Sequence, residues 1–320
     1  MAQRFTFGNA CLHFANADGP RGFIWKYAIS YLLAAILMAC IGYLIFRPVF
    51  TVWYDIMLEA LGGASETEIE RIVTRRLTQV VGRVVLGVIA MIALFVMMWA
   101  VFEAAVQRRY VREEGFSLRL GSDEFRLMAI GLMWFVFYLV TTFLALILGA
   151  FVTGLVVGIT DEAAVIGIAA FIGFGSAGLL WSYFAVRLAP AAAMTIRDGS
   201  ITFFRGWGAT SGRFWKLLLS YILLALAFWL VSSIVSSVFG MTLVASIMSQ
   251  IPRIEQFENN PAELLNILFG FNILAPIMVS VAATIVMHGL FAYVWSGPAA
   301  LAAKTDPRGG GVAQAPDVFL

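Results

Sequence analysis

The sequence has few charged residues, few cysteines and few histidines. Only 12% of its 320 residues are charged and 61% are hydrophobic, whereas soluble globular proteins carry about 25% charged residues. This shortage of charge excludes an ordinary soluble domain and indicates that most of the chain lies in lipid. The cysteines, Cys11 and Cys40, have a spacing that suits neither a disulfide nor a metal site. We therefore expect no disulfide, no metal and no cofactor.

Motifs for catalysis are also scarce. The sequence contains no recognisable Ser/His/Asp set, no glycine-rich phosphate loop and no metal-ligand spacing. We therefore predict no catalytic, cofactor-binding or metal-binding residues, and no enzyme activity. The net charge of +2 is unremarkable, and no nucleic-acid partner is expected.

In place of catalytic motifs, the sequence contains long stretches without charged residues. Each can supply the roughly 20 apolar residues that cross a hydrocarbon core as a helix. They comprise residues 27–46, 84–102, 127–160, 163–186, 217–252 and 264–303. These stretches predict an all-α, polytopic membrane protein with a six-helix transmembrane domain at residues 25–303. The first twenty-odd residues are polar and aromatic, unlike a cleavable signal peptide, so the first span is expected to be retained.

The distribution of basic residues predicts the orientation. With six spans both termini lie on one side, and that side holds fifteen of the twenty-one Lys and Arg residues. By the positive-inside rule this side is cytoplasmic. We therefore predict a multi-pass protein of the bacterial cytoplasmic (inner) membrane with both termini in the cytoplasm. Residues 1–24 are expected to form a cytoplasmic interfacial segment, and the glycine- and proline-rich residues 304–320 a disordered cytoplasmic tail.

Local motifs predict helix starts and one helix contact. Ser65 followed by Glu68 is a capping box, which predicts a helix that starts at Glu66 and runs on into the second span. The run 122–124, Ser-Asp-Glu, is expected to cap the third span. Gly154 and Gly158 in the third run, with several glycines in the fourth, predict close packing of these two helices against each other or a partner.

Aromatic and basic residues stand together where three spans begin, as Trp25-Lys26, Phe125-Arg126 and Trp215-Lys216. These matches indicate that the spans could form three repeated helical hairpins, each preceded by a short cytoplasmic interfacial segment. Internal repeats occur in membrane transporters, but they also build other six-helix bundles.

The loop before the fifth span carries further residues of this kind. Aromatic rings prefer the membrane interface, and basic residues are attracted to anionic headgroups on the cytoplasmic side. We expect an interfacial lipid anchor formed by Phe203, Phe204, Arg205, Trp207, Arg213, Trp215, Lys216, Trp25 and Lys26. Membrane lipids are therefore the expected partners, together with a possible protein partner or a second copy of the chain.

Four polar residues fall inside the predicted spans: Glu103, Arg187, Asn272 and His288. Ionisable residues at membrane depth are functional candidates because they are costly there. Glu103 and Arg187 both lie near the cytoplasmic interface, so we predict that they pair with each other. His288 has no neighbouring ligand residue and is expected to be a hydrogen-bonded packing residue.

The stretch 187–224 carries a family resemblance. It contains Pro190 and Gly199, followed by the pattern Trp207-x-x-Thr210-x-Gly212-x-Phe214-Trp215-Lys216 and an apolar run. It resembles a broad group of bacterial inner-membrane proteins that includes the YciC-like proteins and the membrane domain sometimes fused to glycerophosphoryl diester phosphodiesterases. The resemblance implies a cytoplasmic-membrane protein. The chain has no room for a phosphodiesterase domain, so that activity is not implied.

Three functions follow from these features. The favoured one is a non-enzymatic membrane protein that organises lipids or partner proteins, because no catalytic set is visible and the cytoplasmic loops are basic and aromatic. A transporter or channel is the first alternative, on the basis of the repeat. A membrane-embedded enzyme acting on lipid is the second, and only Glu103, Arg187 and His288 could serve it.

Overall fold

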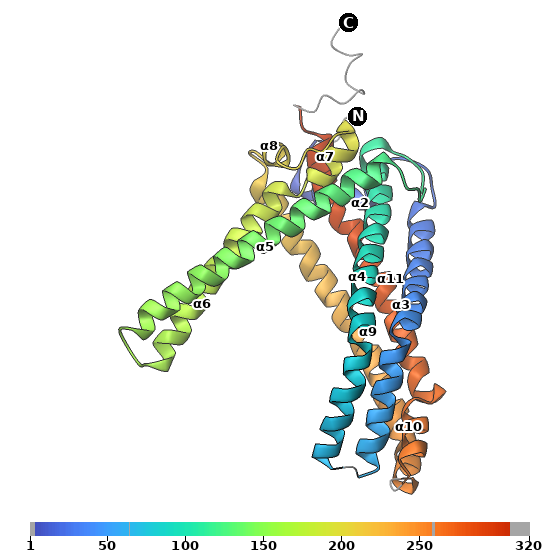
Figure 1. Cartoon of the computed structure of the whole chain (residues 1–320). Helices are drawn as coiled ribbons and strands as arrows, with labels where there is room; N and C mark the ends of the chain where they lie inside the picture. The colour runs from blue at the N-terminus through green and yellow to red at the C-terminus, as the bar shows by residue number, and fades with distance from the viewer. Residues whose placement is uncertain (1–3, 64, 258–259, 308–320) are drawn as a thin grey trace, which may run out of the picture. The chain divides into compact units, whose positions relative to one another are not determined.

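The computed structural model describes residues 4–63, 65–257 and 260–307, and all regular elements in these ranges are α-helices. The described helices are α1 (Phe7–Cys11), α2 (His13–Asn16), α3 (Phe23–Leu61), α4 (Glu66–Arg112), α5 (Ser122–Val157), α6 (Ala163–Leu188), α7 (Ala191–Asp198), α8 (Gly206–Ala209), α9 (Phe214–Gln256), α10 (Pro261–Leu268) and α11 (Phe271–Lys304) (Figure 1). Six helical stretches within the described chain are long and apolar enough to cross a membrane. The predicted all-α class and the six spans are thereby confirmed.

Several of these helices are far longer than a bilayer requires. α4 contains 47 residues, which is about 70 Å of helix, against about 30 Å of hydrocarbon. It starts at Glu66, as the capping box predicts, and continues to Arg112 without interruption. The amphipathic stretch and the second span therefore form one helix that extends beyond the membrane.

The chain divides into two compact units. Unit 1 combines Met1–Phe23, Trp99–Leu224 and Tyr293–Leu320, whereas unit 2 combines Ile24–Met98 and Ala225–Ala292. Unit 1 thus gathers both terminal segments and the two loops that the charge distribution places in the cytoplasm. The predicted disordered tail lies outside the described residues from position 308 onward. The predicted repeat of three hairpins stays a prediction.

Apolar side chains from every part of unit 1 form its core. One cluster joins α6, α9 and α11 through residues such as Val186, Leu217 and Ala302. A second joins α4, α5 and α7 through Ala104, Leu127 and Ile196 among others. Small side chains on α4 and α11 let these helices pack closely.

The N-terminal segment belongs to this core. Thr6 caps α1 by accepting a hydrogen bond from the Asn9 backbone N–H. Ala10, Cys11 and His13 on α1 and α2 are buried. The segment predicted to lie at the interface is therefore helical, with one side packed against protein.

Helices α5 and α6 form an antiparallel hairpin within unit 1 (Figure 1). Their packing confirms the contact expected between the two glycine-rich helices. The close approach, however, is at Gly149 and Gly173: a Cβ on Gly173 would lie 3.2 Å from the Gly149 Cα. A Cβ on Gly154 would meet nothing within 4 Å. The GxxxG pair was therefore the wrong pair of residues on α5, whereas Gly173, one of the glycines of the fourth run, does lie at the contact.

Unit 2 is held together by contacts between its long helices. Arg76 of α4 lies 2.5 Å from Asp55 of α3. Trp53 of α3 packs edge-on against Phe269, which follows α10, with ring centroids 5.9 Å apart. Asn260 caps α10 by accepting a hydrogen bond from the Glu263 N–H.

Candidate functional site

A buried ion-pair network joins the end of α4 to the start of α5. Arg108 Nη1 lies 2.5 Å from Glu124 Oε1, and their side chains are 1% and 0% exposed. Arg108 also donates to the Ser117 carbonyl at 3.0 Å. Arg112 lies 2.8 Å from Asp123 and donates to the carbonyl of Ile196, in the last turn of α7. The network thus ties α4, α5, α7 and the loop 113–121 into one body.

The start of α5 differs in detail from the predicted cap. Gly121 is the N-cap residue, and its backbone N–H donates to Glu124 Oε2 at 2.9 Å. Ser122 is the first helical residue. The two acidic side chains of this first turn, expected to complement the helix dipole, also form ion pairs: Glu124 with the buried Arg108, and Asp123 with the partly exposed Arg112. The cap and the ion-pair network therefore share Glu124.

Two arginines satisfy the carbonyl groups at the C-terminal end of α11. Arg197 donates to the Ala303 carbonyl, and Arg213 donates to the Ala302 carbonyl at 3.3 Å and the Thr305 carbonyl at 3.0 Å. Cations suit this position because the helix dipole places partial negative charge there. Arg213, predicted as a lipid anchor, is therefore engaged within the protein.

One further ion pair connects this helix end to the loop after α4. Lys304 donates a 2.7 Å hydrogen bond to Glu113. This hydrogen bond, together with the positive charge of Lys304, lowers the pKa of the Glu113 carboxyl below its usual value. The C-terminal segment is consequently linked to both loops of unit 1.

A stack of rings fixes the N-terminal segment on α4 and α11. His13 stacks on Tyr110 and Tyr110 on Tyr293, each with ring centroids 5.1 Å apart. Tyr110 donates its hydroxyl to the Tyr293 carbonyl at 2.7 Å. The nitrogens of His13 have no hydrogen-bond partner among the described residues. Burial, with a smaller effect from Lys304 and an opposing one from Asp18, lowers the pKa of His13 from 6.5 to about 4.

The predicted pair of Glu103 and Arg187 does not form. Glu103 accepts hydrogen bonds from Gln107 at 2.6 Å and from Ser296 at 3.3 Å. The Arg187 guanidinium instead lies among three rings, 5.2 to 5.3 Å from their centroids, and donates to a carbonyl of the following loop. Those rings are Tyr183, Trp207 and Phe214, and the carbonyl is that of Thr210. The two residues share a depth, but different neighbours satisfy them.

The predicted anchor residues of unit 1 separate into a buried group and an exposed group. Phe203 is 3% exposed and packs on Trp134, with ring centroids 5.4 Å apart, so it serves with Arg213 as a structural residue. The exposed group, which we call the rim, consists of Phe204, Arg205, Trp207, Trp215 and Lys216. Phe204 and Trp215 are 74% and 71% exposed.

The two basic residues of the rim are available to a ligand. Arg205 lies 3.4 Å from Asp198, but Asp198 has a closer partner in Arg197 at 2.7 Å. Lys216 is exposed and forms no ion pair with any residue in the described ranges. Trp25 and Lys26, at the beginning of unit 2, are also exposed. The rim therefore combines exposed aromatic side chains with two basic residues that lack a close ion-pair partner of their own.

The remaining predicted polar residues lie in unit 2. His288 Nδ1 is 2.8 Å from the Thr284 carbonyl oxygen, and its ring packs edge-on against Phe228. His288 is thus hydrogen-bonded within its own helix, as predicted, but it is exposed, so its role in packing stays a prediction. Asn272 lines a small pocket at the break between α10 and α11, together with Gln250 and Arg253 among others.

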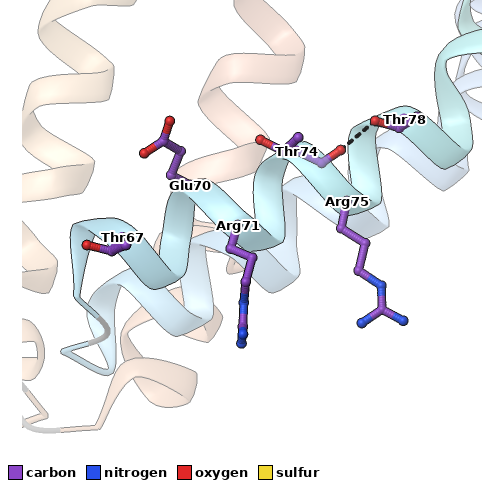
Figure 2. A pocket seen from close by; sticks show the side chains of 6 residues that line it. All are labelled: Thr67, Glu70, Arg71, Thr74, Arg75 and Thr78. Atoms are coloured by element: carbon purple, nitrogen blue, oxygen red, sulfur yellow. Dashed lines mark hydrogen bonds between the residues drawn. The ribbon is translucent and has the colours of Figure 1, made fainter.

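A second charged surface lies on the part of α4 outside the span. Thr67, Arg71, Thr74, Arg75 and Thr78 line a shallow pocket there together with Glu70. Figure 2 shows Arg71 and Arg75 projecting from one side of the helix and Glu70 from the other. All six side chains are exposed, so this part of α4 presents a solvated face.

Sequence reasoning missed Arg108 and Glu124, the most buried ion pair. A signal was present, because a helix end rich in arginine is followed, after a short loop, by two acidic residues in a helix start. Such an arrangement brings the arginines of one helix end close to the acidic residues of the next helix start.

No family model, curated protein or solved structure matches this chain. The resemblance to the YciC-like group remains a prediction, based on residues 187–224.

Proposed function

We propose that this chain is a non-enzymatic protein of the bacterial cytoplasmic membrane that organises anionic lipids, and through them partner proteins, at its cytoplasmic face. The observation that supports this role is the rim. Phe204 and Trp215 expose most of their rings, and the two cations of the rim have no strong partner among the described residues. Unit 1 supplies a rigid base, because ion pairs and arginine caps connect all its segments.

The orientation belongs to the same proposal. Unit 1 contains both terminal segments and the loops at 113–121 and 189–213, which are the segments that the positive-inside rule assigns to the cytoplasm. With both termini cytoplasmic, the rim lies at the headgroup level of the inner leaflet, which is rich in anionic lipid.

Neutralising the rim cations should weaken binding of anionic lipid. Each basic residue near an anionic surface contributes about 1 kcal/mol. Arg205→Gln with Lys216→Gln should therefore raise the Kd for phosphatidylglycerol about 30-fold, and Phe204→Ala with Trp215→Ala should also raise it. Titration of the purified protein, followed by native mass spectrometry, measures this affinity. Arg213 is left intact because its loss would remove the cap of α11.

A matched control removes the same charge elsewhere. Arg83 is the last charged residue before the second apolar run, residues 84–102. Arg75 and Arg71 precede it on α4 by eight and twelve residues, about 12 and 18 Å along the helix. The headgroup layer is only about 5 to 8 Å thick, so Arg71→Gln with Arg75→Gln should leave lipid affinity unchanged. Equal affinities for the wild type and the rim variant would reject the proposal. The rim charges would then act only during insertion of the protein into the membrane.

A transporter is the second candidate, because polar side chains gather where α10 ends and α11 begins. Broken helices with polar linings form substrate sites in many transporters. The pocket here, however, includes the charged residues Arg253 and Glu263, which suit the end of a span better than its middle. Substrate flux into proteoliposomes that is lost on Asn272→Ala would favour transport over the scaffold role.

A further inference from the structure

An apolar groove on α5 lies directly beside the rim. It is lined by Leu132, Met133, Val136, Phe137, Val140, Phe203 and Phe204. The five α5 residues repeat at helical spacing and extend over nine residues, about 12 Å along the helix. The groove belongs entirely to unit 1.

The structure holds the groove open. Phe203 is fixed by its packing on Trp134, and Phe204 packs edge-on against Phe203 with ring centroids 5.2 Å apart. Phe137 is held in turn by Trp181 and by Phe184, each at 5.6 Å. The aromatic walls therefore keep their positions without a ligand.

The depth of the groove matches the acyl region of the membrane. Leu132 lies six residues after Arg126, the last charged residue before the span, and so about 9 Å deeper along the helix. That distance exceeds the headgroup thickness of about 5 to 8 Å. The groove therefore opens into hydrocarbon, where only an acyl chain or another helix can fill it.

The lining favours an acyl chain over a helix. Helix contacts in membranes are enriched in Gly, Ala, Ser and Thr, which let backbones approach. None of the seven lining residues is of this kind. Arg205 directly follows the lining residue Phe204, and its side chain is 55% exposed. Arg205 is thus placed to meet a headgroup phosphate.

We propose that this groove binds one acyl chain of an anionic phospholipid whose phosphate is held by Arg205. The proposal rests on the lipid-organising function and deepens it, because it names a single lipid site with a defined chain position. The remaining rim residues then contact neighbouring headgroups less specifically.

Filling the groove tests this proposal. Val136→Trp should weaken binding of the tightest phosphatidylglycerol at least about tenfold, the loss expected when about two CH₂ groups no longer find a buried position. Leu144→Trp, at an exposed α5 position outside the groove, is the matched control and should bind as wild type does. Arg205→Gln should reduce the preference for phosphatidylglycerol over phosphatidylethanolamine about fivefold. Native mass spectrometry of the full chain titrated with each lipid measures both effects.

The outcomes separate this proposal from the broader one. If Val136→Trp binds its first phosphatidylglycerol with wild-type affinity, the groove is not the site, even where rim neutralisation weakens binding. If the groove variant loses that lipid while rim neutralisation has no effect, the groove binds the acyl chain, but the assignment of the phosphate to Arg205 is overturned together with the headgroup-organising role. A phosphatidylglycerol with a photoreactive acyl chain gives an independent readout on wild-type protein. Cross-links at residues 132–140 support the groove, and cross-links only elsewhere overturn it.

Discussion

Replacing Glu124 with Ala should destabilise the protein by about 3 to 5 kcal/mol, because it leaves the Arg108 guanidinium buried without its nearest counter-charge. The carboxylate lies 2.5 Å from Arg108, and the two side chains are at most 1% exposed. Glu124 also accepts the N-cap hydrogen bond of α5, so its loss affects the helix start as well. Unfolding of the purified protein in detergent measures the change in free energy.

Replacing both partners separates the ion pair from its surroundings. Arg108→Met with Glu124→Leu removes both charges and should recover much of the stability, since apolar residues of similar volume often replace a buried ion pair without loss. Arg119→Gln is the control, because Arg119 is half exposed and lies 3.4 Å from Glu114; it should cost about 0 to 1 kcal/mol. A Glu124→Ala variant as stable as this control would contradict the role assigned to the network.

Acidification should destabilise the protein through His13. The folded-state pKa of His13, about 4, lies below the ordinary value of 6.5. Between these two pH values the unfolded chain therefore binds a proton at His13 that the folded chain does not bind. Stability therefore falls as the pH drops below 6.5 and levels off near 4. Between pH 8 and pH 5 the loss should be about 2 kcal/mol.

His13→Phe should remove this part of the pH dependence while keeping the stack on Tyr110. Phenylalanine carries no titrating group, and it also avoids the two buried nitrogens that lack partners. Unfolding in detergent at pH 8, 6.5 and 5 compares the two proteins, and the interval from 8 to 6.5 serves as an internal control where little change is expected. Equal losses between pH 6.5 and 5 would show that other groups cause the effect.

The sequence predicted the elements of this fold well, because each depends on local or one-dimensional information. Charge-free runs located the six spans, and the Ser65 capping box located the start of α4. The predicted hydrogen bond of His288 is also present, to the Thr284 carbonyl of its own helix. These features depend on hydrophobicity along the chain and on groups within one helical turn.

Features that depend on direction around a helix could not be predicted in this way. Glu103 and Arg187 share a depth, but depth does not say which way each side chain points, and the two bind different partners. The same limit applies to the anchor: composition placed Phe203 and Arg213 near the interface, but packing against Trp134 and the cap of α11 decided that they are structural. The three-dimensional corner between α4 and α5 was needed to show that Glu124 is buried.

The proposed function requires the rim to lie at the headgroup level of the membrane. Spin labels on single cysteines at positions 204 and 215 test it directly, in a chain whose own Cys11 and Cys40 are replaced by Ala. Position 67, on the part of α4 beyond the span, provides the water-exposed reference. In nanodiscs containing phosphatidylglycerol, collision rates with oxygen and with a nickel chelate should place labels 204 and 215 in the headgroup layer and label 67 in water. If labels 204 and 215 show the same nickel accessibility as label 67, the rim does not contact the membrane, and the proposed lipid-organising function is wrong.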